Sequence, residues 1–467
     1  DPLLAIDHAT DVDAGPDVVD VVPNTPVNLI GTATDPDGGA VSVLWELIEA
    51  PGQSGIDSGD LLNANTLSVD FIPDTPGLYK LQLTGVESGG ITTDVANVYV
   101  IGDVLVPEDY GSLEDAFAAV SDGYFIDVGP GTWPTNLIVR NTDLRIRGAG
   151  RDQTILDGGS AGGVIDILGA AVLDLSDLTL RGGKAGEGGG IRAQSPSSPD
   201  LQAFLQSVDF VENEAVKGGG ANFNGSSYVE LRDVRFLDNG AAVDGGGLYL
   251  RVTDEVIATH TSFAGNIALA NGGALLSIDG HMKWTNGLCV DNLAARGGCV
   301  RVENNGDTID VDAAHITAAF NEATHVEDGG SFASANSLGN LLIQNSIIAN
   351  HKGEPEVFYA QGIPATNLPQ LIDIRYSLLV QDDPNDLYST NVVEPTVFVQ
   401  ESTVLPMFVD VTDDMDWTND DYQILPGDAQ VEDQGAWLEE PDRGYDDDGS
   451  DPDLGAFGGS LGSTFTF

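Results

Sequence analysis

The sequence has little positive charge. Among its 467 residues there are 18 Lys and Arg against 74 Asp and Glu, and the formal net charge is −56. Nucleic-acid binding needs clustered Lys and Arg that neutralise phosphates, so this composition excludes nucleic acid as a natural partner. An anionic membrane would repel the chain for the same reason. The acidity suits a protein that stays soluble in a saline environment, or one that binds calcium at several weak sites.

Long apolar runs and a leader segment are also missing. No stretch of about 18 consecutive apolar residues occurs, so we expect no membrane-spanning segment. The chain begins with Asp1 rather than Met, and no signal peptide is visible at its start. We therefore expect a mature, processed product.

Cysteine is nearly absent. The two cysteines, Cys289 and Cys299, fall within one copy of the repeat described next. Either a disulfide across that copy or two buried free thiols would fit this placement.

A repeat dominates residues 210–302. Each copy has an apolar residue, two further residues, an Asn and, after a short spacer, a glycine pair. The copies read FVENEAVKGGGANF, FLDNGAAVDGGGLYL, FAGNIALANGGALL and CVDNLAARGGCVRV, starting at Phe210, Phe236, Phe263 and Cys289. Their Asn residues are Asn213, Asn239, Asn266 and Asn292, in steps of 26, 27 and 26 residues. A fixed period in this range indicates a stacked repeat architecture.

The repeats alternate apolar and polar residues, as in YVELRDVRF and VIATHTSF. Such alternation is typical of strands with one buried face, and three short strands with their turns fit into one period. We therefore expect an all-β chain built around a right-handed parallel β-helix. The apolar residue of each copy would stack inside, and the Asn residues would form a ladder at a turn, where Asn and Gly tolerate positive φ.

These FxxN and GG-Ala/Ile/Leu repeats resemble those of the polymorphic outer membrane proteins and, more widely, of bacterial surface right-handed β-helix proteins. The resemblance implies a β-helix fold and a location that is extracellular or on the outer surface of a bacterium. It implies no particular chemistry.

Residues 1–103 have a different texture, with short alternating runs separated by turns. This spacing predicts an immunoglobulin-like β-sandwich, with Trp45 in its core and Tyr79 at the start of a late strand. The DPDGG turn, the Trp45 strand and FIPDTPGLYKLQL resemble PKD modules, which act as spacers or adhesion units. Asp35 and Asp37 are candidate calcium ligands, but a DPDG turn forms well without metal, and we favour the turn.

The two ends of the chain hold apolar residues without an evident place. Leu3, Leu4 and Ile6 precede the first expected strand of the sandwich, and Phe465 and Phe467 close the chain. They are candidate subunit contacts, as strands donated to a neighbouring copy. The alternative at the start of the chain is an edge strand or a disordered terminus.

The β-helix is predicted over residues 104–395, with residues 396–467 as its closing segment. A helix over 112–123, capped by Ser112, would cover the open end of the first coil. The following segments resemble the opening coils of pectate-lyase-like β-helices. In the closing segment the candidate calcium ligands are Asp446, Asp448, Asp451 and Asp453, although the Glu of an EF-hand loop is missing.

Catalysis is the less favoured alternative. A polysaccharide lyase or hydrolase needs paired carboxylates, or a base beside a calcium cluster. By repeat register Lys217 and Arg296 align with Asp244 and Asn271, which makes a mixed column rather than a basic cleft. The six His residues share no metal-ligand spacing. The sequence therefore assigns no catalytic residue.

The favoured function is that of a non-enzymatic structural protein in adhesion or extracellular assembly. It would bind other copies of itself, surface glycans or proteins, and one form of assembly is a fibre joined head to tail through the terminal strands. Calcium is the only cofactor that the sequence suggests. The alternative is a polysaccharide-binding or polysaccharide-cleaving, pectate-lyase-like enzyme.

Overall fold

The structure is a computed structural model of the chain. It describes residues 9–51, 54–87, 90–120, 124–195, 201–251, 253–303, 309–325, 331–335, 339–349, 358–361, 372–380, 396–399, 408–410 and 421–424. The chain forms two compact units, Asp1–Val128 with Thr142–Ile146, and Gly129–Asn141 with Arg147–Phe467. The predicted domain boundaries at 103/104 and 395/396 stay predictions.

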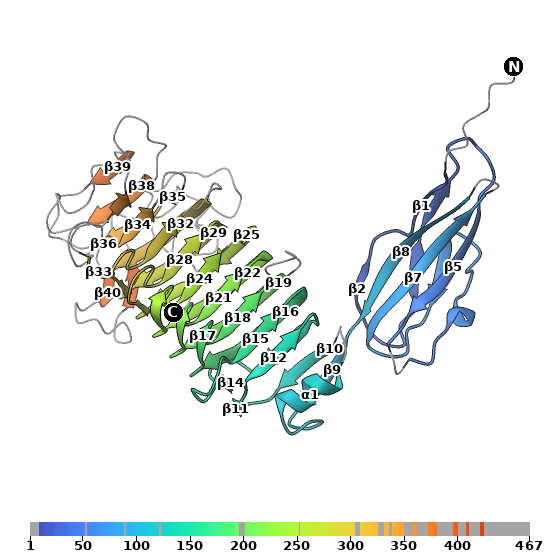
Figure 1. The fold of residues 1–467 in the computed structure, drawn as a ribbon, viewed down its shortest axis with the longest axis horizontal. Coiled ribbons are helices and arrows are strands. Elements are labelled where there is room, and N and C mark those ends of the chain that lie inside the picture. Colours follow the sequence, from blue (N-terminus) through green and yellow to red (C-terminus); the bar gives the residue numbers. More distant parts are fainter. Residues whose placement is uncertain are drawn as a thin grey trace, which may run out of the picture. The chain divides into compact units, whose positions relative to one another are not determined.

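The first unit contains the predicted β-sandwich (Figure 1). Its four-stranded sheet has the order β2-β8-β7-β5, with β2 Val18–Val21, β8 Ile91–Val100, β7 Gly77–Val86 and β5 Ser42–Glu49. Two strand pairs complete it, β3 Val27–Ile30 with β6 Ser68–Phe71 and β1 Asp11–Asp13 with β4 Thr32–Thr34; η1 spans Ser58–Asp60. Alternation along β7 buries every second side chain. Trp45 and Tyr79 are both in the core, as predicted.

The first unit also contains β9 (Gly102–Val106), β10 (Tyr124–Val128) and most of β13 (Leu144–Gly148). β9 and β10 pair in parallel. Between them lies α1, Leu113–Ala119, which is shorter than the helix predicted over 112–123. The Ser112 side chain accepts a hydrogen bond from the Asp115 amide, and Leu113 and Ala116 are buried. Whether this helix caps a coil stays a prediction.

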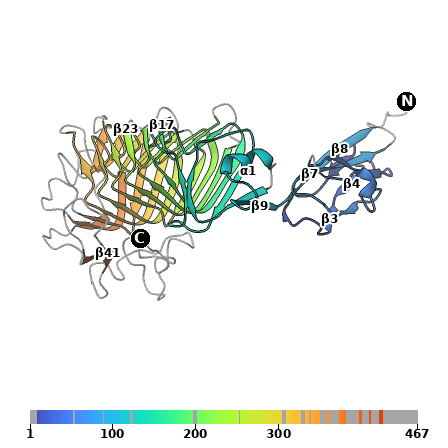
Figure 2. The ribbon, with the colours of Figure 1, turned by 90° about the horizontal axis from the view of Figure 1, so that it is seen from below.

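The second unit is a parallel β-solenoid, as predicted (Figures 1 and 2). Its nine-stranded sheet consists of β12 Leu137–Arg140, β15 Ile165–Leu168, β18 Ile191–Gln194, β21 Ala221–Asn224, β24 Leu248–Arg251, β28 Leu275–Ile278, β31 Val300–Glu303, β34 Phe332–Ala335 and β37 Phe358–Gln361. Its six-stranded sheet consists of β17 Lys184–Glu187, β20 Glu214–Lys217, β23 Gly240–Asp244, β27 Ile267–Ala268, β30 Leu293–Ala294 and β33 Glu322–Ala323.

The third face of the coils is the long sheet, whose strands reach 12 residues. Its strands in this unit are β11 Gly131–Pro134, β14 Thr154–Asp157, β16 Ala171–Arg181, β19 Leu201–Val211, β22 Ser226–Leu237, β25 Glu255–Thr259, β26 Ser262–Ala264, β29 His281–Val290, β32 Ile309–Ala319, β35 Gly339–Gln344, β36 Ile347–Ala349, β38 Ile372–Val380 and β39 Thr396–Val399. A separate antiparallel pair joins β40, Phe408–Asp410, to β41, Asp421–Ile424.

The repeat period sets the register of the coils. Phe210 aligns with Phe236, Phe236 with Phe263, and Phe263 with Cys289. Since identical positions fall on top of one another, a residue type that recurs every 26 or 27 residues forms a column along the solenoid.

The glycine of each copy that precedes the nine-stranded sheet has a backbone only glycine adopts easily. Its φ is +65° at Gly218, +65° at Gly245, +66° at Gly272 and +68° at Gly297. A Cβ on Gly218 would lie 2.4 Å from the carbonyl oxygen of Ala221. The glycine pairs of the sequence therefore mark a turn that a side chain would block.

No helix among the described residues is long and apolar enough to cross a membrane.

Candidate functional site

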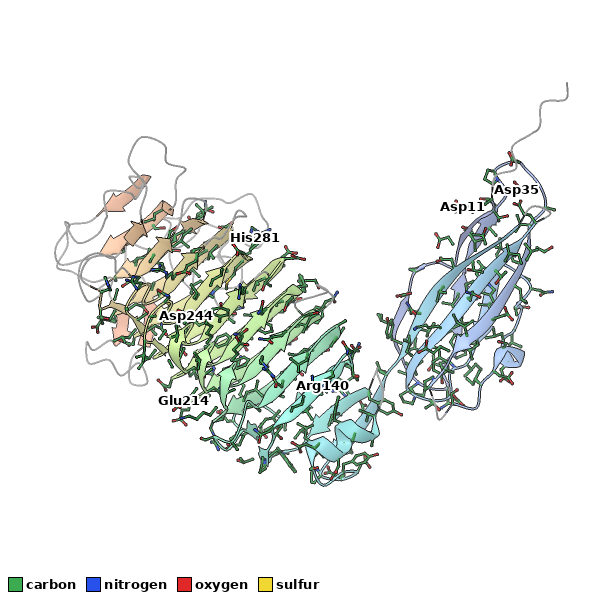
Figure 3. All side chains as sticks on the ribbon, in the orientation of Figure 1. Asp11, Asp35, Arg140, Glu214, Asp244 and His281 are labelled. Carbon is green, nitrogen blue, oxygen red and sulfur yellow. A yellow bond between two sulfur atoms is a disulfide. The ribbon has the colours of Figure 1, made fainter. Side chains whose placement is uncertain are left out.

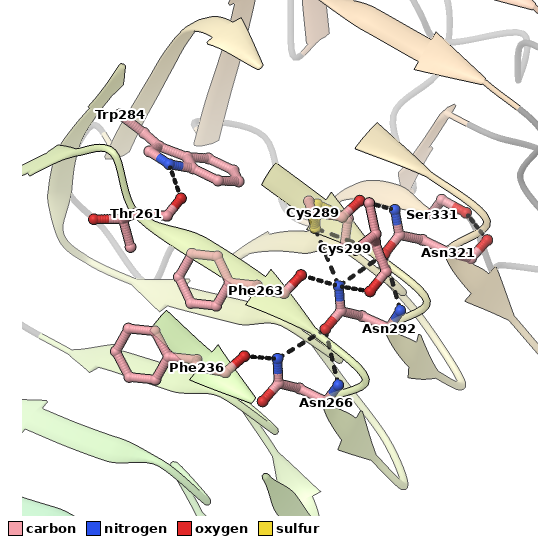
Figure 4. The surroundings of a disulfide bond; sticks show 11 residues. Phe236, Thr261, Phe263, Asn266, Trp284, Cys289, Asn292, Cys299, Asn321 and Ser331 are labelled. Carbon is pink, nitrogen blue, oxygen red and sulfur yellow. Dashed lines mark hydrogen bonds between the residues drawn. A yellow bond between two sulfur atoms is a disulfide. The ribbon is translucent and has the colours of Figure 1, made fainter. Parts of the chain in front are cut away.

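The solenoid interior contains a continuous asparagine ladder. The side chains of Asn213, Asn239, Asn266 and Asn292 are at most 1% exposed, and Asn321 continues the series at 0%. Each amide nitrogen donates to the side-chain oxygen of the next Asn, for example at 3.1 Å from Asn213 to Asn239. Figure 4 shows the bond from Asn266 to Asn292, which is 2.9 Å long. Because buried amides are costly when unpaired, this pairing is what allows a polar column inside an apolar core.

The same Asn residues also bind the backbone of neighbouring coils. The Asn266 amide nitrogen donates to the Phe236 carbonyl at 2.8 Å, and its oxygen accepts from the Asn239 backbone amide at 3.1 Å. Beside the ladder the rings of Phe210, Phe236 and Phe263 stack with centroids 4.6 and 4.9 Å apart. The predicted columns are therefore structural features of the coil.

Cys289 and Cys299 form a disulfide with a Cα–Cα distance of 6.0 Å. Both residues are fully buried. Cys289 occupies the position that Phe263 holds one coil earlier, and Cys299 follows the glycine pair (Figure 4). The disulfide thus crosses one coil at the end of the Phe stack, beside Asn292 and Asn321.

A second polar column was not predicted. It lies in the middle of the long strands, where one residue per coil has positive φ: Asp177, Ser207, Asp233, His260, Asn286, His315 and Asn345, with φ between +47° and +56°. Asn, Asp and His are the non-glycine residues most tolerant of this region. The position bends each long strand so that it can follow the coil. Residue type varies along the column, which hides it in the sequence.

Several basic residues of the solenoid form ion pairs between coils. Several side-chain pairs connect residues about one coil apart: Arg181–Asp157, Arg192–Asp166, Lys184–Glu214, Arg235–Asp209 and Lys217–Asp244. Asp209 is the centre of the largest cluster. Its carboxylate lies 2.6 Å from Arg235 and 3.3 Å from Arg151, and only 4% of its side chain is exposed. Arg151 also reaches Asp233, at 2.8 Å.

The most varied group of polar side chains lies at the corner between the six- and nine-stranded sheets. The predicted alignment of Lys217, Asp244, Asn271 and Arg296 is confirmed by their strand register, and Glu187 aligns with Lys217 on the preceding coil. Figure 3 labels Asp244 on the solenoid. The Lys217 ammonium lies 3.5 Å from Asp244 and 5.2 Å from the ring centroid of Tyr249. Asn271 donates to Asp244 at 2.8 Å. We call Lys217, Asp244, Tyr249 and Asn271 the corner cluster.

Two members of the corner cluster, Lys217 and Tyr249, have raised pKa values. Burial lowers the pKa of Lys217, but Tyr249 and Asp244 outweigh burial and the net pKa is raised. Burial also raises the pKa of Tyr249. Both groups therefore keep their protons at neutral pH, and a general base needs a group that gives its proton up near that pH. Neither Lys217 nor Tyr249 is therefore suited to act as a general base.

The outer face of the nine-stranded sheet beside the corner cluster is buried. Asn222, Tyr249 and Leu276 point away from the coil interior, yet each is at most 2% exposed. The Asn222 side-chain oxygen and one Arg301 nitrogen are buried without a hydrogen-bond partner. This burial had no signal in the sequence, because outward positions of a strand are normally solvated.

The candidate calcium ligands are only partly described. Asp35 closes a turn: its carboxylate accepts from the backbone amides of Asp37 and Gly39, both at 2.7 Å. Asp446, Asp448, Asp451 and Asp453 lie outside the described residues. So do the predicted subunit contacts Leu3, Leu4, Ile6, Phe465 and Phe467. Within the described residues, no three His, Cys, Asp or Glu side chains are grouped to hold a metal ion.

No protein-family model matches this chain, and no curated protein matches it. Among solved structures, a pectin methylesterase in complex with a hexasaccharide is 12% identical, with 62% of this chain and 89% of that chain covered and a TM-score of 0.26. The pectin methylesterase PemA from Erwinia chrysanthemi is 11% identical, with 62% and 91% covered and a TM-score of 0.27. The PKD domain of human KIAA0319 is 19% identical, with 20% and 80% covered and a TM-score of 0.18. These values are too low to carry an activity over to this chain.

Proposed function

We propose that this chain is a secreted or cell-surface structural protein that acts in adhesion or extracellular assembly. The observation that carries the proposal is the use of polar side chains to join coils. The Asn ladder and the charge pairs such as Arg235–Asp209 connect each coil to the next. A solenoid held in this way is stiff along its axis, which suits a rod that spans a distance or presents a surface.

The buried disulfide supports a location outside the cytoplasm. Disulfides form and persist in oxidising compartments and are rare where thiols are kept reduced. Together with the FxxN repeats, it favours in our proposal a surface protein of the polymorphic outer membrane protein type. A bacterium in a saline environment would account for the net charge of −56.

Within this function, we favour a fibre joined head to tail over a lone adhesin. The apolar segment at Leu3–Ile6 and the aromatic Phe465 and Phe467 are the proposed joints, because a heterologous contact between two ends propagates without closing. Electron microscopy of the native protein, with and without a calcium chelator, tests this. Regular filaments that disappear when residues 1–10 are deleted would support it, and uniform single rods under all conditions would reject it.

The second candidate function is the binding of a polysaccharide, and it depends on the corner cluster. Tyr249 with Lys217, Asp244 and Asn271 combines an aromatic ring with hydrogen-bonding groups, as carbohydrate sites do. The structure gives this candidate less support, because Tyr249 is only 2% exposed. Retention on a panel of immobilised acidic glycans, lost in Lys217→Ala, would favour it. Release of new reducing or unsaturated ends from those glycans would favour the enzyme alternative.

A further inference from the structure

The outward side chains of the nine-stranded sheet are buried along five successive coils. They occupy the same outward position of β21, β24, β28, β31 and β34, as the strand register shows, and they are Asn222, Tyr249, Leu276, Arg301 and Ala333. Their exposures are 1%, 2%, 0%, 5% and 0%. Each coil of a solenoid packs only on its two neighbours, so outward side chains normally keep contact with solvent.

The long sheet shows how much burial the neighbouring coils provide by themselves. Phe204, Glu230 and Ile257 are aligned on its outward face, and each has an aligned residue on both sides. All three are only half-buried. The column on the nine-stranded sheet also has a coil on either side of each residue from Asn222 to Arg301. Its deeper burial therefore comes from atoms that lie on top of the sheet.

The described residues account for little of this cover. The Lys217 ammonium lies over the Tyr249 ring, 5.2 Å from its centroid, which explains part of the burial at that one position. Tyr249, Leu276 and Ile278 form a buried apolar cluster, and within the described part of the chain no partly buried apolar side chain packs against it. The structure contains a single chain. The cover thus belongs to a segment of this chain outside the described ranges.

Buried polar atoms on the same face show what kind of group covers it. The side-chain oxygens of Asn222 and Asn271 and one terminal nitrogen of Arg301 are buried without a hydrogen-bond partner among the described residues. The Nε atom of Arg301 donates to Glu303 at 2.6 Å, so the unpaired nitrogen is a further donor. Buried polar groups are costly unless they are paired. A polypeptide supplies both the N–H donors and the oxygen acceptors that these three atoms need.

The length and connections of the undescribed stretches select one of them. From residue 304 onward, each stretch outside the described ranges joins two described strands, except residues 425–467, which follow β41 and form the longest stretch. Five strands about 4.8 Å apart span about 19 Å, a distance that about six extended residues cover. Residues 425–467 can therefore reach along the whole column.

The composition of this stretch matches the face. Its aromatic and aliphatic residues suit the apolar cluster, and they include Trp437, Leu438 and Phe457. Its acidic run at 446–448 complements the unpaired nitrogen of Arg301.

We propose that residues 425–457 of this chain pack lengthwise on the outward face of the nine-stranded sheet, over Tyr249, Leu276 and Ile278. Apolar side chains of the segment cover this cluster, and its backbone and carboxylates pair with the buried polar atoms of the face. The inference goes beyond the proposed function, because it applies to a single chain whether or not copies assemble. A glycan then reaches the corner cluster only by displacing an acidic segment of the same chain.

Photo-cross-linking from the sheet identifies the covering segment. Both natural cysteines are in the disulfide, so Arg251→Cys, at an exposed outward position of β24, offers a single free thiol for a benzophenone label. After irradiation the cross-link should map to residues 425–457 by mass spectrometry, and the product should remain a monomer. A cross-linked dimer, which would assign the cover to a second copy, or no cross-link to this segment, would overturn the proposal.

A label on the other face is the matched control. The Arg232 side chain is 67% exposed on the outward side of the long sheet. The same label on Arg232→Cys should give no cross-link to residues 425–457. Equal cross-linking from both positions would mean that the segment has no preferred face, and would overturn the proposal.

Substitutions in the segment test its apolar contacts. Trp437→Ser with Leu438→Ser should lower the cross-linking yield at least about ten-fold, because two apolar anchors are lost. It should also expose Tyr249 to hydroxyl-radical oxidation, while Trp284, 1% exposed in the coil interior, stays protected because the solenoid remains folded. Phe465→Ser with Phe467→Ser, outside the proposed segment, should change neither result. Equal effects of the two double substitutions would overturn the proposal.

Discussion

A single asparagine of the ladder contributes several hydrogen bonds that no other group can replace. Asn266 accepts from Asn239 and donates to the Phe236 carbonyl and to the Asn292 oxygen. Asn266→Ala would remove these bonds together with the one that the Asn266 oxygen accepts from the Asn239 backbone amide, and each buried group left unsatisfied costs about 1–3 kcal/mol. We expect a loss of at least about 3 kcal/mol in the free energy of unfolding of the solenoid.

Denaturant titration followed by circular dichroism measures this loss. The control is Asn224→Ala, at a half-buried, outward position on β21 of the nine-stranded sheet. There the free energy of unfolding should change by no more than about 0.5 kcal/mol. Equal effects of the two substitutions would mean that the ladder adds nothing beyond ordinary packing.

In the sandwich, the carboxylate of Asp74 has a clearly lowered pKa. Desolvation raises its pKa, but hydrogen bonds from Ser54, the Gly55 amide and Tyr79 outweigh this and lower the pKa to about 2, against an ordinary value of 3.8. The Tyr79 hydroxyl also bonds the backbone of Thr75, so Asp74 holds a turn against the core.

A depressed pKa sets the direction of the pH dependence. The contribution of Asp74 to stability is complete above pH ~4 and is lost as the pH falls toward ~2. Asp74→Asn should therefore flatten the fall in sandwich stability across this window. Hydrogen exchange of the β7 amides, measured in the full chain, follows it. The exposed Glu46→Gln serves as control, and a wild-type slope in Asp74→Asn would contradict the assignment.

Some of these residue-level features could be predicted from the sequence, and others could not. The FxxN pattern was enough to predict which Asn residues align, since one residue type recurs at one spacing. The second polar column could not be predicted, because Asp177, Ser207 and His260 share a positive φ but differ in side-chain chemistry. The burial of Tyr249 could not be predicted either, since local alternation places it on the outside of its strand.

At the scale of the element, the disulfide coil is a departure from the repeat. Cys289 replaces the stacked Phe, and Cys299 takes the place of Ala274 on the preceding coil, as the register of β28 with β31 shows. Closing a loop with a sequence separation of 10 stabilises the chain by roughly 2–4 kcal/mol. The disulfide thus occupies the position at which the preceding coil packs the ring of Phe263.

The disulfide can be replaced by the Phe and Ala that the preceding coil has at the same two positions. Cys289→Phe with Cys299→Ala restores the pattern of the preceding coil and extends the stack from Phe263. It should keep more stability than Cys289→Ser with Cys299→Ala, which has neither the bond nor the ring; the difference should be about 1–3 kcal/mol. Thermal unfolding of both double variants decides this. A less stable Phe variant would show that the coil has no room for the ring.

The type of secondary structure was easier to predict from the sequence than the length of each strand. Alternation predicted strands in every coil, and register predicted parallel stacking. The sequence suggested short strands, whereas β16, β19 and β22 run for 11 to 12 residues through the bend. A positive-φ residue interrupts the alternation without ending the strand, so period-two counting divides one element into two.

For the whole molecule, the net charge of −56 is the dominant electrostatic fact. Self-repulsion destabilises the compact state and is screened by any salt. Specific calcium binding instead stabilises only the folded chain and saturates with concentration. The two effects are separable, because screening depends on ionic strength alone.

We therefore predict two distinct responses of the unfolding temperature. NaCl should raise it steadily. CaCl₂ at equal ionic strength should add a further gain that saturates and that a chelator reverses, because carboxylate oxygens are the ligands Ca²⁺ prefers. If Asp446, Asp448, Asp451 and Asp453 hold the ion, changing all four to Asn should remove the calcium gain and leave the NaCl response intact. Asp35→Asn, at a turn closed by backbone hydrogen bonds, should leave the calcium gain unchanged. Identical unfolding temperatures in NaCl and CaCl₂ at equal ionic strength would mean that the acidic residues bind no calcium specifically and only keep the surface solvated in salt.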